Sequence, residues 1–199
     1  MNIFYLSNST TKCAEYHVDR HVTKMCIEYA QLLSTAHRLL DGTEYFDKTS
    51  NNRKIKRWML PDERESLLMK STHPKHPSAI WCRESKKNYQ WLYNLWKDLL
   101  SEYTYRYGKN HACSRLLDVL ATPPTNIPNK PFTEPTPAMP DECKVPGDAL
   151  QSYHNYYFMN KGHLWSWKGK INSRERPRWM SDMAMQKLHD TNQELGLTY

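Results

Sequence analysis

The 199-residue sequence contains no run of about 18 apolar residues, so it predicts no membrane-spanning helix. Its first residues lack the basic stretch and the long apolar segment of a signal peptide. No Cys-x-x-Cys pair occurs, which argues against both a disulfide framework and a thiolate zinc site. The five cysteines are widely spaced (Cys13, Cys26, Cys82, Cys113, Cys143). These absences predict a protein of a reducing cytoplasm without a membrane partner.

Glycine is also scarce, with six residues and no glycine-rich phosphate loop. Few glycines and many helix formers predict an all-α or mostly α fold, and the length predicts one domain over residues 1–199. We expect a short extended segment over 2–6, a polar loop over 43–57 and two long helices over about 11–40 and 78–106. Eight of the twelve prolines lie within 122–146, which predicts an ordered loop wrapped on the core. Residues 180–199 are typical of a weak helix or tail.

The charge balance indicates a polyanionic partner. The net charge is +7, and many of the seven tryptophans and 13 tyrosines lie next to lysine or arginine. Bases stack on such aromatic side chains while cations hold phosphates, so we expect DNA or a nucleotide as partner. Two segments carry the predicted contacts. The first comprises Arg53, Lys54, Lys56 and Arg57, and the second contributes Lys168, Lys170, Arg174, Arg176, Arg178 and Trp179.

A polar stripe on the first predicted helix is the main candidate for chemistry. At 100° per residue, its members fall on one narrow arc beside the apolar face: His17, His21, Lys24, Glu28, Gln31, Thr35 and Arg38. We predict that Glu28 acts as an acid, base or charge stabiliser, tuned by His17, His21 and Lys24. The alternative for Lys24 and Glu28 is an ordinary helix ion pair.

The same stripe offers a second hypothesis, a divalent-metal site. The His17-x3-His21 spacing places two imidazoles on one helix face, with Glu28 as a third ligand. Lys24 lies between them and would repel a cation. We therefore expect no metal or cofactor, and keep a metal-dependent hydrolase using His17, His21 and Glu28 as the alternative.

A histidine- and proline-containing segment, residues 71–78, immediately precedes the second predicted helix. It supplies His73, Lys75, His76 and Ser78. Free backbone N–H groups and the positive end of the helix dipole bind anions, so this segment predicts a phosphate site. The alternative is a loop followed by an ordinary N-cap at Ser78.

Several blocks of the chain resemble a largely uncharacterised family of tailed-bacteriophage proteins. They are MNIFYL at 1–6, YHVDRHVTKM at 16–25, AQLLSTAHR at 30–38, HPSAIW at 76–81, EYTYRYG at 102–108 and AMPDE at 138–142. The order of features is also distantly similar to phage pyrimidine-dimer DNA glycosylases of the endonuclease V type. The shared features are an extended N-terminus, a first helix bearing His and Glu, a His before the central helix, and the late Arg-Pro-x-Trp at 176–179.

This resemblance implies a compact basic helical enzyme whose N-terminal amine, here that of Met1, attacks the sugar C1′ while Glu28 assists. The leading prediction is therefore a phage base-excision glycosylase/lyase in the cytoplasm of an infected bacterium. In it Glu28 manages proton or oxocarbenium charge, and His73 and His76 hold phosphate. Besides the metal-dependent hydrolase, a non-enzymatic binder of a host factor or signalling nucleotide remains open.

Overall fold

The computed structural model describes residues 2–194 and is mostly helical, as the composition predicts. Within these residues, 3-10 turns and one two-stranded sheet accompany the α-helices. The elements are α1 (Thr10–Tyr16), α2 (Asp19–Asp41), β1 (Thr43–Lys48), β2 (Lys54–Met59), α3 (Arg64–Leu67), α4 (Pro77–Glu84), α5 (Lys86–Tyr107), η1 (Ala112–Leu116), α6 (Leu117–Ala121), η2 (Asp141–Cys143), α7 (Ala149–Asn160), η3 (Gly162–Leu164) and α8 (Arg178–Glu194). No helix of the described chain is both long and apolar enough to cross a bilayer.

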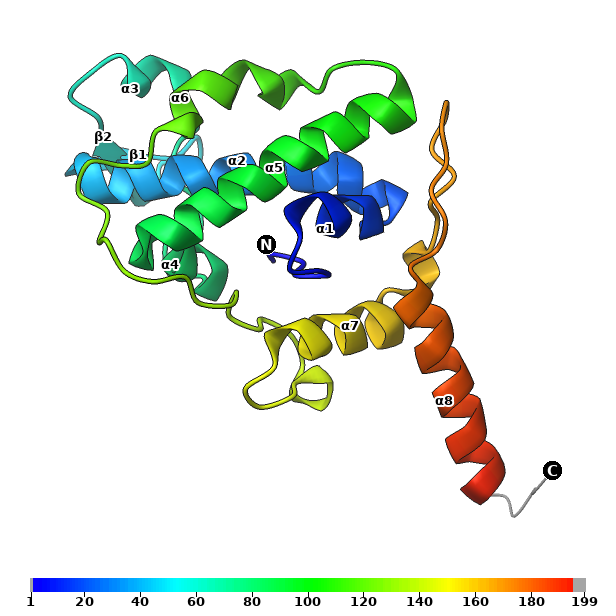
Figure 1. Ribbon diagram of the computed structural model, residues 1–199. Helices are drawn as coiled ribbons and strands as arrows, with labels where there is room; N and C mark the ends of the chain where they lie inside the picture. The colour runs from blue at the N-terminus through cyan, green and yellow to red at the C-terminus, as the bar shows by residue number, and fades with distance from the viewer. Residues whose placement is uncertain (1, 195–199) are drawn as a thin grey trace.

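The centre of the molecule is the packing of α5 against α2, with α1 on α5 and α4 against both (Figure 1). Trp96 on α5 is fully buried and donates its indole N–H to the Cys26 carbonyl of α2, 2.8 Å away. The extended residues 3–6 are buried in the same core, and all five cysteines are buried and free. Helix α8 extends away from the other helices (Figure 1).

The helix predicted over 11–40 is interrupted, because His17 and Val18 adopt extended backbone conformations. Two side chains from distant segments stabilise this break. The Val18 N–H donates to the Tyr157 hydroxyl at 3.1 Å, and the Arg106 guanidinium donates to the His17 carbonyl at 2.9 Å. His17 therefore follows α1, whereas His21, Lys24 and Glu28 belong to α2. The seven-residue stripe is not a feature of one helix.

The helix predicted over 78–106 is likewise two helices, α4 and α5, separated by extended Ser85. The Ser85 hydroxyl accepts the Lys87 N–H at 3.1 Å and donates to the Lys130 carbonyl at 2.5 Å. The proline-rich segment thus fixes this break. Within 122–146, η2 is the one helical stretch of the described backbone, which also turns at 125–126, and the Thr133 carbonyl accepts the Trp81 indole N–H at 3.0 Å.

The polar loop predicted over 43–57 is instead an antiparallel β-hairpin, β1–β2, paired from Thr43 with Met59 to Lys48 with Lys54. Successive side chains of a strand point to opposite faces. The less exposed face carries Tyr45, Ile55 and Arg57. The burial of this face explains why so charged a segment forms strands.

Candidate anion-binding site

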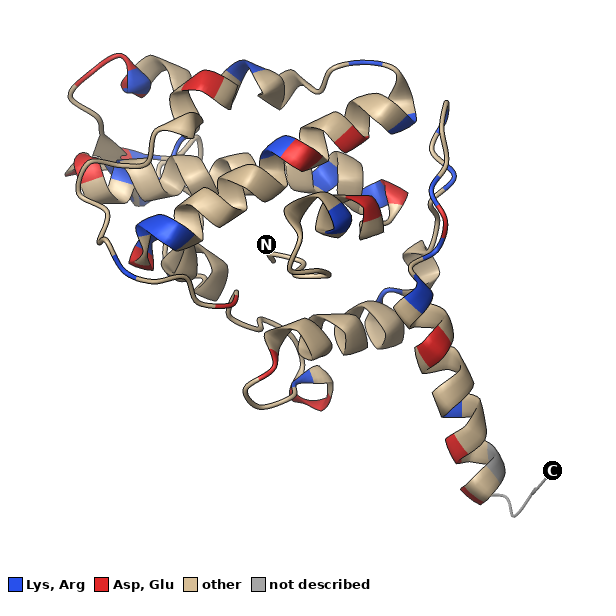
Figure 2. Cartoon of the chain, in the orientation of Figure 1, with Lys and Arg blue, Asp and Glu red and all other residues tan. Residues whose placement is uncertain are grey.

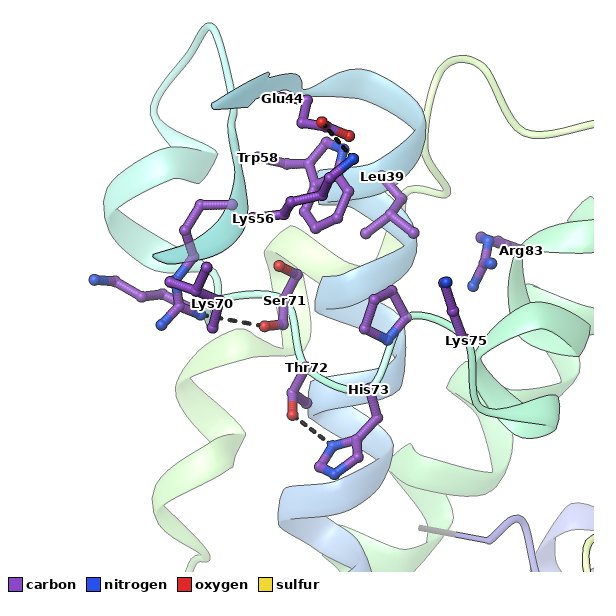
Figure 3. Close-up of a pocket in the computed structure, with 13 residues that line it drawn as sticks. Leu39, Glu44, Lys56, Trp58, Lys70, Ser71, Thr72, His73, Lys75 and Arg83 are labelled. Atoms are coloured by element: carbon purple, nitrogen blue, oxygen red, sulfur yellow. Dashed lines mark hydrogen bonds and ion pairs between the residues drawn. The ribbon is translucent and has the colours of Figure 1, made fainter. Parts of the chain in front are cut away.

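A cavity of about 700 Å³ lies between the hairpin, the segment 70–75 and α4 (Figure 3). It brings together residues of the first basic segment, 53–57, and of the histidine- and proline-containing segment, 71–78, which the sequence analysis treated as separate sites. Lys56 and Arg57 come from β2, and His73 and Lys75 come from the segment before α4. The complete lining is Leu39, Glu44, Ile55, Lys56, Arg57, Trp58, Lys70, Ser71, Thr72, His73, Pro74, Lys75 and Arg83.

The cavity is strongly basic. Five of its side chains are cationic, namely Lys56, Arg57, Lys70, Lys75 and Arg83. Its one carboxylate, that of Glu44, pairs with the Lys56 ammonium at 2.8 Å (Figure 3). The positive charge therefore greatly exceeds the negative charge. Leu39, Ile55 and Trp58 add apolar and aromatic surface, so the cavity suits an anion that also carries a flat or apolar portion. Sequence reasoning missed Trp58, Lys70 and Arg83, which belong to no basic cluster or motif.

The two arginines retain hydrogen-bonding capacity. Arg57 donates one N–H to the Ser71 carbonyl at 3.4 Å, while its Nε is buried without a partner among the described residues. Arg83 donates to the Ala79 carbonyl at 2.8 Å, and its partial burial lowers the pKa of its guanidinium. A buried donor without an acceptor costs free energy. An anionic ligand near Arg57 would relieve that cost.

His73 stands at the rim of the cavity in the left-handed backbone region, with φ of 46°. Non-glycine residues adopt this conformation at a cost of about 1–3 kcal/mol, and it is frequent at ligand sites. The His73 carbonyl accepts the His76 N–H at 2.9 Å, which closes a turn before α4. The His73 imidazole is exposed and contacts the Thr72 hydroxyl through Nδ1 at 2.6 Å (Figure 3).

The N-terminus of α4 differs from the prediction, because His76 rather than Ser78 is the N-cap. The Ser78 N–H donates to Nδ1 of His76 at 3.2 Å, so Nε2 carries the proton of the neutral ring. The Ser78 side chain is buried beneath this cap. The helix end is thus partly closed by its own residue, and the residues of this segment that line the cavity include His73 and Lys75.

Arg38 of α2 positions the walls of the cavity. It is 3% exposed and donates to the carbonyls of Met69 (2.6 Å), Leu68 (2.9 Å) and Trp58 (2.9 Å). It also contacts both the carboxylate and the carbonyl of Glu65. One guanidinium therefore ties the hairpin, α3 and the segment before the cavity to α2. The sequence placed Arg38 on the polar stripe without predicting this role.

The two histidines of the stripe are built into the core. His17 is fully buried, donating through Nδ1 to the Cys13 carbonyl (2.7 Å) and accepting the Tyr29 hydroxyl at Nε2 (3.0 Å). His21 accepts the Tyr157 hydroxyl at 2.7 Å and stacks on Phe4, with ring centres 4.2 Å apart. Burial lowers the pKa of His17 to about 4 and that of His21 to about 2. Both rings are therefore neutral at pH 7, and their hydrogen bonds are those of a structural network.

Glu28 pairs with exposed Lys24 at 3.1 Å, as the spacing predicts. Its charge also reaches His76: burial lowers the pKa of this histidine, with a further decrease from His73 and an opposing increase from Glu28. The charges of Glu28 and His73 thus both act on His76, but of these three residues only His73 lines the cavity. Met1, whose amine the resemblance nominates as nucleophile, lies outside the described residues.

The proposed metal ligands His17, His21 and Glu28 are not assembled into one site. Three of the four imidazole nitrogens of His17 and His21 already form hydrogen bonds, with the Cys13 carbonyl and the hydroxyls of Tyr29 and Tyr157. Within residues 2–194, no group of three or more His, Cys, Asp or Glu side chains is arranged to hold a metal ion.

The second predicted basic segment lies at the opposite end of the molecule from the hairpin (Figure 1), and lysines and arginines occur at both ends (Figure 2). Residues 165–176 form a strap held by Asp19, whose carboxylate accepts the Ser166 hydroxyl (2.6 Å) and the Lys168 N–H (3.0 Å). Arg174 binds the buried Glu102 carboxylate at 2.8 Å. Of the other residues predicted to contact nucleic acid, Lys168 and Lys170 are exposed. The Arg176 guanidinium lies over the Trp165 ring, and Trp179 stacks on His154. Arg178 is the first residue of α8.

Arg53 and Lys54 also lie outside the cavity, at the turn and the first residue of β2. The structure thus brings Lys56, Arg57, His73 and Lys75 together and separates them from the strap. A comparison of the chain with protein families, curated proteins and solved structures finds no match.

Proposed function

We propose that the protein is an enzyme acting on DNA or nucleotides and that the basic cavity holds a phosphate of the substrate. The observation that carries this proposal is the convergence of five cations from three chain segments on one cavity of about 700 Å³. The one lining carboxylate already pairs with one of these cations. Like charges held together repel each other, so an anionic occupant would stabilise the site.

The chemistry of the donors favours phosphate. Guanidinium groups present several N–H donors in a planar fork that matches phosphate oxygens, and Arg57 and Arg83 supply two such groups. Lys70 and Lys75 add mobile point charges. Trp58 and Ile55 offer surface for a base or sugar, and the cavity volume lies within the range typical of small-ligand sites.

We assign the chemical step to Glu28, whose charge acts on His76, the N-cap of α4 that follows the cavity-lining His73. A carboxylate can stabilise the positive charge that develops on a sugar C1′ when its bond to the base breaks and both electrons leave with the base. The Nε2–H of neutral His76 is a donor for a phosphate or a leaving group. A nucleophile then bonds to C1′ and gives up a proton to the departing base. With water this is a glycosylase; with an amine, for which the resemblance nominates that of Met1, opening of the sugar ring gives the Schiff base of a base-excision glycosylase/lyase. We assign no chemical role to His17 and His21, because their hydrogen bonds are internal to the core.

Binding and chemistry are tested with different variants. Arg83→Gln removes a charge-assisted contact to phosphate worth about 1.5–3 kcal/mol, so affinity for an oligonucleotide should fall roughly 10- to 100-fold. Glu28→Gln should retain binding and lose both base release and the borohydride-trapped adduct on dimer-containing or abasic DNA. Glu142→Gln, an exposed glutamate of η2, is the matched control. Unchanged affinity in Arg83→Gln would refute the phosphate site, and full activity in Glu28→Gln would refute its role.

A non-enzymatic nucleotide binder is the second candidate. It is favoured by the neutral, internally bonded state of His17 and His21, which leaves fewer groups for chemistry than the sequence suggested. Under this alternative, binding remains sensitive to Arg83→Gln, while no base release or covalent adduct forms with the wild-type protein.

A further inference from the structure

The outer face of the β-hairpin carries an aromatic and basic strip that begins at the cavity. Strand pairing sets Trp58 opposite Glu44, Lys56 opposite Phe46 and Lys54 opposite Lys48. All six side chains point to the same face, because each is two residues from the next along its strand. Trp58 and Lys56 also line the cavity. We call these six residues the hairpin strip.

Phe46 is the unusual member of the hairpin strip. Its ring is 55% exposed, although burial of a phenylalanine ring is favourable. The Lys54 ammonium lies 3.7 Å from the ring centre and the Lys56 ammonium lies 5.7 Å from it. An exposed aromatic ring flanked by lysines is the combination that stacks a base and binds its phosphates. Because Lys54 is itself exposed, its side chain can move aside when a base takes its place.

The position of the two aromatic rings suits successive bases. Trp58 and Phe46 are diagonal neighbours on adjacent strands, a relation that separates residues by about 7–8 Å. The strip continues a further residue pair beyond Phe46 to Lys54 and Lys48, about 7 Å along the strands. Its only carboxylate, that of Glu44, is paired with Lys56. Charge along the strip is therefore complementary to a polyanion.

We propose that the hairpin strip binds an unpaired nucleic-acid strand that leaves the cavity, with successive bases stacked near Trp58 and on Phe46. This inference rests on the proposed phosphate site and adds the substrate class: a single strand of several nucleotides rather than a mononucleotide. A duplex keeps its bases stacked on each other, so it cannot offer them to Phe46. Phosphates between the bases contact Lys48, Lys54 and Lys56.

The test compares the affinities of dT2 and dT6 by calorimetry. The dT2 probe reports on the cavity, and dT6 also reaches Phe46. Because dT6 can bind in several registers, a higher affinity for dT6 than for dT2 is expected in any case. The informative quantity is the difference in dT6 affinity between variants. Phe46→Ala should weaken the affinity for dT6 about 30-fold, the middle of the range for one stacked base, and leave the affinity for dT2 unchanged. Phe46→Tyr, which keeps the ring, should restore dT6 binding.

Met59→Ala is the matched control, since Met59 is 52% exposed on the opposite face of the same hairpin. A double Lys48→Gln, Lys54→Gln variant should reduce the salt slope of log affinity for dT6 by about 1.4, which is 0.7 per phosphate contact on a single strand. Wild-type dT6 affinity in Phe46→Ala, or tighter binding of a duplex than of dT6, would overturn the inference. If Arg83→Gln leaves the affinity for dT2 unchanged, the proposed phosphate site is refuted instead.

Discussion

Replacing Arg38 with methionine should loosen the walls of the cavity without changing any residue that lines it. The variant keeps a long apolar side chain in the same space but removes every N–H donor. The carbonyls of Trp58, Glu65, Leu68 and Met69 then lose their partner. This perturbation isolates the hydrogen bonds that join the hairpin, α3 and the segment 70–75 to α2.

The magnitude follows from the burial of these acceptors. A fully buried carbonyl without a donor costs about 1–3 kcal/mol, and partly exposed ones cost less because water replaces the donor. The Leu68 bond is the buried one, whereas the other three are partly exposed. The Glu65 side chain is 42% exposed, so its ion pair adds little. The variant also no longer has to bury the charged guanidinium, and this offsets part of the loss. We therefore expect the free energy of unfolding to fall by about 3 kcal/mol.

Urea unfolding measures this loss, and at a slope of about 2 kcal/mol per molar the midpoint should fall by roughly 1.5 M. Oligonucleotide affinity should fall as well, because the cavity donors are no longer held in place. Arg20→Met is the control, since Arg20 is exposed on the same helix. A midpoint shift below about 0.3 M, or wild-type affinity in a variant that has lost stability, would refute the positioning role of Arg38.

Two further predictions concern the core and the strap. Because burial holds the pKa of His17 near 4 and that of His21 near 2, the unfolded chain binds more protons below pH 6.5. The free energy of unfolding should therefore fall by about 4 kcal/mol between pH 7 and pH 5. Urea unfolding at a series of pH values measures this fall, and a change of less than about 1 kcal/mol would contradict the burial of both histidines as neutral rings. Gly169→Ala should destabilise the protein by about 2 kcal/mol or more and expose 165–176 to proteolysis. The φ of Gly169 is 59°, and a Cβ at this position would lie 2.2 Å from the Asn172 carbonyl oxygen. An unchanged melting temperature in the variant would contradict this prediction.

The helical character of the fold could be predicted from composition, but the helix breaks could not. Residues 11–40 have continuous helical periodicity, and nothing local marks His17 and Val18 as extended. Their partners, Arg106 and Tyr157, are 89 and 139 residues away. Ser85 is similar, because its hydroxyl bonds to Lys130. A break that depends on contacts between distant segments leaves little trace in the neighbouring sequence.

The hairpin did leave a signal. In the structure, exposure alternates along most of 43–48 and 54–59, and Ile55 between Lys54 and Lys56 is the trace of that alternation in the sequence. The signal was weak because the covered face includes the charged Arg57 and the exposed face includes the aromatic Phe46. Hydrophobic alternation was therefore obscured, and the high charge suggested a solvated loop. Both exceptions lie where we propose that a ligand binds: the half-buried Arg57 at the cavity and the exposed Phe46 on the hairpin strip.

The site itself was predicted in parts but not as a whole. Composition and motifs nominated both basic segments, yet nothing in the sequence indicated that β2 and the segment before α4 meet. Their meeting depends on α2, where Arg38 binds the carbonyls of both walls and the Thr35 hydroxyl accepts the Thr72 N–H at 3.1 Å. These two residues are the last two of the seven in the polar stripe.

The stripe therefore has two physical roles. Its first residues, His17 and His21, satisfy hydrogen bonds within the core, while Thr35 and Arg38 fix backbone carbonyls and amides beneath the cavity. A cavity lined by a hairpin and a short segment has little core of its own, so without such anchoring its cations would move apart under their mutual repulsion. Holding the backbone to a central helix keeps the donors in place before the ligand arrives, which reduces the ordering cost of binding. Polar residues at the margin of a core can thus build a site that none of them lines.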